Sequence, residues 1–80
     1  MLQICYTEKL EGPVPGQKIV TVETAGGHPE EIIVDESLLI NGSLRVAVVA
    51  RREKEMLVEL PVESASGKWR LWVDESKVHK

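Results

Sequence analysis

The ionisable and nucleophilic side chains of this chain form no pattern that performs catalysis. The sequence contains no Gly-x-Ser-x-Gly elbow, no His-Glu-x-x-His, no P-loop and no Cys-x-x-Cys. Its single cysteine, Cys5, and its two histidines, His28 and His79, do not stand at metal-ligand spacing. We therefore expect no catalytic residue, no metal site and no cofactor. We expect Cys5 to be a small buried or half-buried strand residue.

Adjacent acidic residues are the side chains of this sequence that could most readily take part in catalysis or cation binding. They occur at Glu30-Glu31, Asp35-Glu36 and Asp74-Glu75, and paired carboxylates serve in acid–base catalysis and in cation binding. Adjacent strand residues point to opposite faces of a sheet, so the members of a pair need not share a site. The last two pairs belong to a repeated Val-Asp-Glu-Ser motif that is typical of a strand end followed by a tight or 3₁₀ turn. The repeat spacing of thirty-nine residues fits either a duplicated half-domain or a coincidence.

The elements that position these residues are strands. Sixteen of the 80 residues are Val or Ile, and they recur with period two in short runs separated by Gly, Pro, Asn and Ser. The connections are too short for crossover helices, so we expect antiparallel pairing. Asn41-Gly42 is typical of a tight type I′ turn. The predicted strands are Leu2–Tyr6, Gln17–Thr24, Glu30–Val34, Leu44–Val49, Met56–Leu60 and Trp69–Val73.

This pattern predicts an all-β fold in a single small domain that spans residues 1–80, as an antiparallel barrel or sandwich of five or six strands. Trp72–Val78 resembles the last strand, 3₁₀ turn and closing Val of SH3-type barrels. An SH3-like barrel is therefore our first expectation, and an OB-like or Greek-key barrel is the alternative. Val14–Thr24 is similar to the segment before the modified lysine of lipoyl-carrier domains. Ala25-Gly26-Gly27 stands where that lysine belongs, so we do not expect a carrier.

Composition limits the class of partner. Thirteen acids against ten bases give a net charge of −3 without a long block of either sign, whereas phosphate binding needs a concentrated basic surface. Nucleic-acid binding is therefore a disfavoured alternative. The cations of a nucleic-acid site would be Arg45, Arg51, Arg52, Lys54, Lys68 and Arg70, with Trp72 as a stacking surface.

The sequence also bears on location. No stretch approaches the ~20 apolar residues of a membrane span, and no leader pattern opens the chain. With one cysteine and no internal disulfide, we expect a cytoplasmic location and no membrane.

Strand alternation predicts which apolar side chains are left on the outer face. With Val46, Val58 and Leu71 inward, an outer set emerges from three successive strands. A contiguous apolar patch on a sheet face marks a partner surface, and an Arg beside it is a typical polar anchor. In the alternative, the Gly/Pro loop or the C-terminal tail covers Trp72, and nothing is left to bind. The outer set is Ala47, Val49, Leu57 and Trp72, and the predicted partner-binding residues are Val49, Leu57, Arg70 and Trp72.

The sequence thus predicts a non-catalytic protein-interaction or assembly module that binds a protein partner or associates weakly with itself. An accessory subunit of an enzyme complex is a further alternative. The same alternation groups Trp69 with the inward Leu71 and Val73. Trp69 is therefore predicted to be the more buried of the two tryptophans, and Trp72 the more exposed.

Overall fold

The alternating apolar runs form strands, as the sequence predicts. The computed structural model describes residues 2–80, and all of its strand pairs are antiparallel. The expectation of an antiparallel all-β fold is confirmed. Two 3₁₀ turns, η1 (Glu36–Leu38) and η2 (Glu75–Lys77), precede β5 and β9. The strands are β1 (Leu2–Cys5), β2 (Glu8–Glu11), β3 (Gln17–Glu23), β4 (Pro29–Asp35), β5 (Leu39–Ile40), β6 (Ser43–Arg52), β7 (Glu55–Glu59), β8 (Arg70–Asp74) and β9 (Val78–His79).

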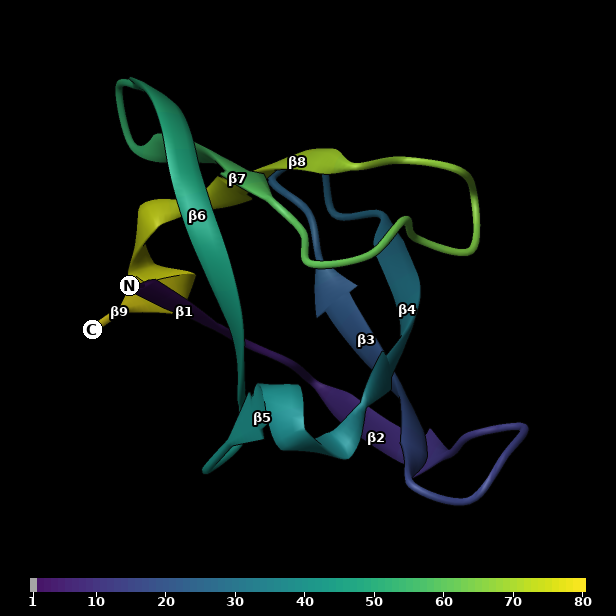
Figure 1. Cartoon of the computed structure of the whole chain (residues 1–80). Coiled ribbons are helices and arrows are strands. Elements are labelled where there is room, and N and C mark those ends of the chain that lie inside the picture. The colour runs from purple at the N-terminus through teal and green to yellow at the C-terminus, as the bar shows by residue number, and fades with distance from the viewer. Residues whose placement is uncertain (1) are drawn as a thin grey trace.

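Two sheets share these strands, and within residues 2–80 they do not close into a barrel. One sheet has the order β8-β7-β6-β1-β9, with β5 also pairing with β6, and the other has the order β2-β3-β4 (Figure 1). There are more strands than the five or six predicted, because β2 is mostly charged and β5 and β9 have two residues each. Such segments carry no alternating apolar signal. None of the helical segments in the described residues is long and apolar enough to span a membrane.

The inner faces of both sheets contribute to one aliphatic core. The core arises because alternate residues of each strand point to the same face of the sheet. Strand β4 shows this most clearly, since its residues alternate between exposed and buried along its whole length. Each Val, Leu or Ile that is fully buried stabilises the fold by about 1.5–3 kcal/mol. The completely buried side chains are Ile4, Val20, Val22, Ile32, Leu44, Val58 and Val73.

The two halves of the chain repeat one architecture. Strands β2-β3-β4 and β6-β7-β8 are both meanders, and each is followed by a 3₁₀ turn and a two-residue strand. The carboxylates of Asp35 and Asp74 cap the two turns by accepting the backbone N–H of Ser37 and Ser76, each at 2.9 Å. The Val-Asp-Glu-Ser motif is therefore a strand end with a 3₁₀ turn in both copies, as predicted.

The halves join along β1 and β6. Ile4 lies opposite Leu44 at the centre of the β1–β6 pair. On their other sides, Ile4 pairs with Val78 of β9 and Leu44 pairs with Leu39 of β5, and Leu39 and Val78 are thirty-nine residues apart. The two short strands β5 and β9 therefore take corresponding places beside β6 and β1.

Each half also donates one loop hydrogen bond to the other half. In the β3–β4 turn, the backbone N–H of Ala25 donates to the carbonyl of Trp72 at 2.8 Å. In the β7–β8 connection, the N–H of Ala65 donates to the carbonyl of Glu31 at 2.8 Å. These two bonds fix the last strand of each meander against the opposite sheet.

Two burial predictions are wrong. Trp69 is 53% exposed, whereas Trp72 is half-buried. The inward alternation does not reach Trp69 because β8 begins at Arg70 and Trp69 belongs to the preceding loop. Cys5 is exposed rather than buried, since it points away from the core while its neighbour Ile4 points into it.

A buried carboxylate holds the β7–β8 connection against β4. Glu30 points inward and is 8% exposed, and one of its oxygens accepts hydrogen bonds from Ser66 at 2.6 Å and Ser64 at 3.0 Å. Lys68 Nζ lies 3.7 Å from the other oxygen. The Ser66 hydroxyl, with Ser64 and Lys68, lowers the pKa of Glu30 against the opposing effect of burial. The charged form of Glu30 is therefore the one that stabilises the fold.

We predict that Gly42→Ala destabilises the protein by about 1–2 kcal/mol, because both residues of the Asn41-Gly42 turn have positive φ, 46° and 84°. Open space surrounds the position of an added Cβ at Gly42, so backbone strain is the expected cause. Urea unfolding measures the loss. Gly26→Ala is the control, since Gly26 has no positive φ, and an equal loss at both positions would contradict the turn.

We predict that Glu30→Gln lowers the free energy of unfolding at neutral pH by about 1–3 kcal/mol, because a charged acceptor is lost. The folded pKa of Glu30 is depressed, so its contribution is present above the unfolded pKa of about 4 and disappears as the pH falls through the folded value. Urea unfolding at a series of pH values should show the parent and Glu30→Gln converging in acid. Glu31→Gln, on the exposed face of β4, should behave like the parent at every pH, and a constant difference between parent and Glu30→Gln would refute the role of the charge.

Candidate functional site

Leu57 and Trp72 lie directly opposite each other on the outer face of β7 and β8. On the other side of Leu57, Ala50 of β6 is its register partner. These three residues form a cross-strand line that we call the Trp72 row, and each of them is half-buried. Cross-strand neighbours of this kind are within contact distance on one sheet face. The structure therefore brings two of the predicted partner-binding residues together.

Val49 falls outside this row because of a β-bulge. The register of β6 against β7 shifts between Val48 and Ala50, so Val49 is an extra residue without a cross-strand partner. Its side chain is 44% exposed. The bulge gives Ala50 the position opposite Leu57, and strict alternation along the sequence cannot predict that exchange.

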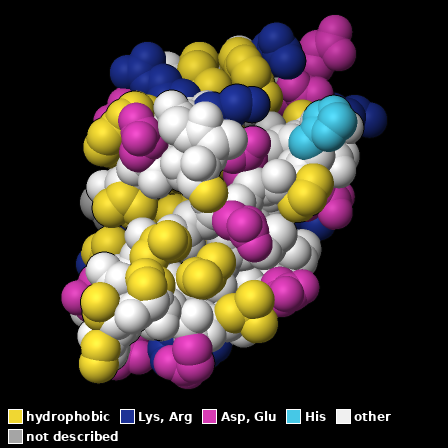
Figure 2. All heavy atoms as spheres, turned by 90° about the vertical axis from the view of Figure 1, so that its right-hand side faces the viewer, with side chains coloured by type: hydrophobic (Ala, Val, Ile, Leu, Met, Phe, Trp, Pro, Cys, Tyr) yellow, Lys and Arg dark blue, Asp and Glu magenta, His cyan; other side chains and the backbone are white. Residues whose placement is uncertain are grey.

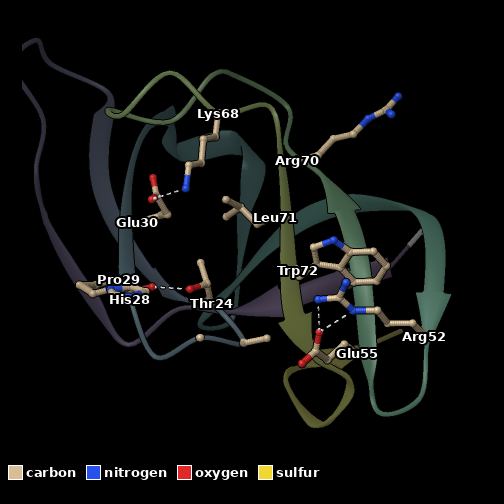
Figure 3. Close-up of a pocket in the computed structure, with 12 residues that line it drawn as sticks. Thr24, His28, Pro29, Glu30, Arg52, Glu55, Lys68, Arg70, Leu71 and Trp72 are labelled. Carbon is tan, nitrogen blue, oxygen red and sulfur yellow. Dashed lines mark hydrogen bonds and ion pairs between the residues drawn. The ribbon is translucent and has the colours of Figure 1, made fainter.

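Arg52 also belongs to this surface, although the sequence suggested it only as a cation of a nucleic-acid site. Its guanidinium carbon lies 4.0 Å from the centre of the Trp72 ring, which is a cation–π contact. The Nε and Nη2 atoms of Arg52 donate to Glu55 Oε1 at 3.0 and 2.9 Å. Figure 3 shows the guanidinium between the indole and the Glu55 carboxylate. Glu55 thus holds the cation against the ring.

Arg70 flanks the Trp72 row rather than contacting its centre. Its Nε and Nη2 atoms each lie 3.0 Å from Glu59 Oε2. Glu59 and Arg70 are cross-strand partners, two residues along β7 and β8 from the Leu57–Trp72 pair. In Figure 3 the Arg70 side chain extends away from the indole. It contributes an exposed, partly neutralised cation to the edge of the surface.

A cavity of about 830 Å³ adjoins Trp72, between β8 and the β3–β4 turn. Glu30 and Lys68 lie on one side of it, Trp72 and Arg52 lie on the other, and Leu71 lies between them (Figure 3). Its volume falls within the range of ligand-binding clefts. Its complete lining consists of Thr24, Ala25, Gly26, His28, Pro29, Glu30, Arg52, Glu55, Lys68, Arg70, Leu71 and Trp72.

The two segments that were the alternative cover for Trp72 lie elsewhere. The Gly12–Gly16 loop is bonded to Gln17 and η1 through Gly12 and Gly16, and the C-terminal strand β9 pairs with β1. Neither segment lines the cavity beside Trp72. Trp72 is half-buried, with Leu57 opposite it in the sheet and Arg52 over its ring.

A Ser–His hydrogen bond connects β6 and β9, the two strands that flank β1 in the larger sheet. Ser43 Oγ is 2.7 Å from His79 Nε2 and 3.9 Å from Cys5 Sγ. Ser43 is 2% exposed, so its hydroxyl is closed to a substrate in this structure, and the bond joins β6 to β9. Within residues 2–80 no group of three His, Cys, Asp or Glu side chains is placed to hold a metal ion.

We predict that Trp69 is quenched by acrylamide more readily than Trp72, when each is observed alone in the Trp72→Phe and Trp69→Phe variants. The reason is that Trp69 is 53% exposed and Trp72 is half-buried beneath Arg52. Adding Arg52→Ala to the Trp69→Phe variant should increase the quenching of Trp72 and cost about 0.5–1 kcal/mol of stability. Arg51→Ala is the control, since the Arg51 guanidinium contacts Met56, and an equal effect of both alanines would contradict the cation–π contact.

No family model, curated protein or solved structure matches this chain. A proposal for the function therefore rests on the geometry of the Trp72 row and of the adjoining cavity. The Trp72 row consists of Ala50, Leu57 and Trp72, and the guanidinium of Arg52 lies over the indole ring.

Proposed function

We propose that this protein is a non-catalytic protein-interaction module that binds a protein segment through the Trp72 row and the adjoining cavity. The observation that carries the proposal is a half-buried Trp72 between an apolar cross-strand neighbour and a fixed Arg52, beside a cavity of about 830 Å³. Trp and Arg are the residue types that dominate the energetics of protein interfaces. The contact between Arg52 and Glu55 supports a surface that is ordered before binding, which reduces the entropic cost of association.

Protein is favoured over nucleic acid by the partners of the cations. Of the six cations proposed for phosphate binding, three form ion pairs with acids: Arg52 with Glu55, Lys68 with Glu30, and Arg70 with Glu59. Neutralised cations release fewer counterions when phosphate binds. The net charge of −3 also opposes association with a polyanion.

An SH3-like plan and a cytoplasmic location remain parts of this proposal. The SH3-like plan is supported by the succession of β8, the 3₁₀ turn η2 and the closing Val78. The cytoplasmic location is supported by the single free Cys5 in an 80-residue chain, where a small secreted domain would normally depend on disulfides.

We predict that the parent protein enriches extended peptides from a displayed random-peptide library and that Trp72→Ala weakens their binding at least about 30-fold, the effect of losing a residue that dominates an interface. Trp69→Ala is the matched control, because Trp69 is an exposed tryptophan outside the row. Circular dichroism and urea unfolding establish that each variant is folded. Raising the salt concentration should weaken binding far less than the roughly 10³-fold loss that several phosphate contacts produce.

Two results would overturn the proposal. The first is a parent protein that enriches no peptide, and the second is a set of enriched peptides that bind Trp72→Ala as tightly as the parent. If Trp72→Ala proves unfolded, Arg52→Ala provides the second test. That variant removes the cation from the ring and leaves the β7–β8 ladder intact.

A further inference from the structure

We infer that the protein segment binds as an additional strand on the free edge of β8, where its backbone pairs with the backbone of Arg70 and Trp72. This inference rests on the proposed function, since it states how the same site holds an extended segment of another protein. Strand β8 ends the larger sheet, with β7 on one side and, within the described residues, no strand on the other. An exposed sheet edge presents unpaired N–H and C=O groups, which an extended chain can bond.

The hydrogen bonds at the start of β8 show which of its backbone groups face this edge. The N–H of Leu60 donates to the carbonyl of Trp69 at 2.8 Å, so these two residues form a hydrogen-bonded pair next to the β7–β8 ladder. Hydrogen-bonded and non-hydrogen-bonded pairs alternate along antiparallel strands. Leu71 therefore bonds to β7, whereas Arg70 and Trp72 direct their N–H and C=O groups away from β7.

One of these outward groups is already bonded, and its partner limits the free edge. The N–H of Ala25 donates to the carbonyl of Trp72 at 2.8 Å, which is independent evidence that Trp72 faces away from β7. Within residues 2–80 no other hydrogen bond reaches the outward backbone groups of Arg70 and Trp72. The groups left for an added chain are the Trp72 N–H and both the C=O and the N–H of Arg70.

The cavity beside Trp72 provides room for an added strand. Its lining includes Arg70, Leu71 and Trp72 of β8 and, across from them, Glu30 and the β3–β4 turn (Figure 3). Its volume of about 830 Å³ therefore adjoins the part of β8 whose outward groups are free. Side chains alternate between the two faces of a strand. An added strand would thus place alternate side chains beside the indole of Trp72 and the others toward the pair formed by Glu30 and Lys68.

The other sheet edges are less suited to strand addition. Strand β9 has two residues, and β2 is charged at three of its four positions. Strand β4 begins with Pro29, which has no N–H, and the carbonyl of Glu31 already accepts the N–H of Ala65. Charged residues, proline and short length are features that keep edges from pairing. The centre of β8, Leu71–Val73, has neither a charged residue nor a proline.

Side-chain chemistry alone does not single out this end of the molecule. On the side shown in Figure 2, hydrophobic side chains gather over the lower half. The upper end, where the β7–β8 connection lies in Figure 1, mixes basic, acidic and hydrophobic side chains. Lys68 and Arg70 are already in ion pairs. Backbone hydrogen bonds require no matching charge, and an extended chain is the kind of partner that supplies them in a row.

Amide hydrogen exchange tests the added strand in the parent protein, with the tightest peptide enriched from the random library as the probe. The amides of Arg70 and Trp72 should exchange rapidly in the free protein and at least about 10-fold more slowly when the peptide is bound. The amides of Leu71 and Val73 should be protected in both states, because they bond to β7. Unchanged exchange at Arg70 and Trp72 in the complex would overturn the inference.

A pair of variants at one position isolates the backbone donor from the side chain. Arg70→Ala and Arg70→Pro both remove the guanidinium, but only Arg70→Pro also removes the N–H at the edge. Proline is tolerated at the first residue of a strand and where the N–H faces away from the sheet, and Arg70 meets both conditions. We expect Arg70→Pro to bind the same peptide about 10-fold more weakly than Arg70→Ala. Equal binding by two folded variants contradicts strand addition.

The remaining outcomes separate this inference from the proposed function. If the parent enriches no peptide, both fail. Peptides that need Trp72 but leave the exchange of Arg70 unchanged keep the interaction function and exclude the added strand. Protection of Arg70 and Trp72 that rises with protein concentration, without peptide, indicates pairing of β8 between two copies and overturns a foreign segment as the occupant.

Discussion

The antiparallel pairing of β1 with β6 is the contact on which the rest of the structure depends. It sets Ile4 against Leu44 at the centre of the molecule, where both side chains are completely buried. Strands β5 and β9 complete the sheet on either side of this pair. Each meander alone would leave its inner face of Val, Ile and Leu residues in contact with water, which is unfavourable. Only the joined halves bury both inner faces.

Because the halves join through their inner faces, the inner faces form the core and the outer faces meet solvent. Because β3, β4, β7 and β8 each alternate between the core and solvent, every inward Val or Leu is balanced by an outward residue. Half of the outward residues on these strands are charged, but Ile19, Ile33, Leu57 and Trp72 are apolar. Apolar outward residues add nothing to the common core. Their placement is equivalent in both halves, since each pair lies two residues before the Asp that caps a 3₁₀ turn.

The sequence was sufficient for the fold class and for features that depend on local chemistry. The Asn41-Gly42 turn and the two 3₁₀ turns follow from backbone preferences and short-range capping, which act within a few residues. The pairing of Leu57 with Trp72 was also within reach, because successive hairpin strands are neighbours. The bulge at Val49 and the exposure of Trp69 were not, since each depends on where a strand starts or slips relative to its partner. Arg52 and Glu30 acquire their roles from residues on other strands or loops, and periodicity along one strand carries no information about such contacts.

The most direct test of the binding surface is the indole N–H signal of each tryptophan in a ¹⁵N-labelled sample, recorded while an enriched peptide is added. Trp72 and Trp69 are three residues apart in sequence, but Trp72 lies in the row beneath Arg52 and Trp69 lies in the preceding loop. We expect the Trp72 signal to shift in proportion to peptide bound, together with the backbone amides of Leu57 and Arg52, while the Trp69 signal stays in place. A shift confined to Trp69, or shifts that leave the Trp72 row unchanged, would contradict the assignment of this surface.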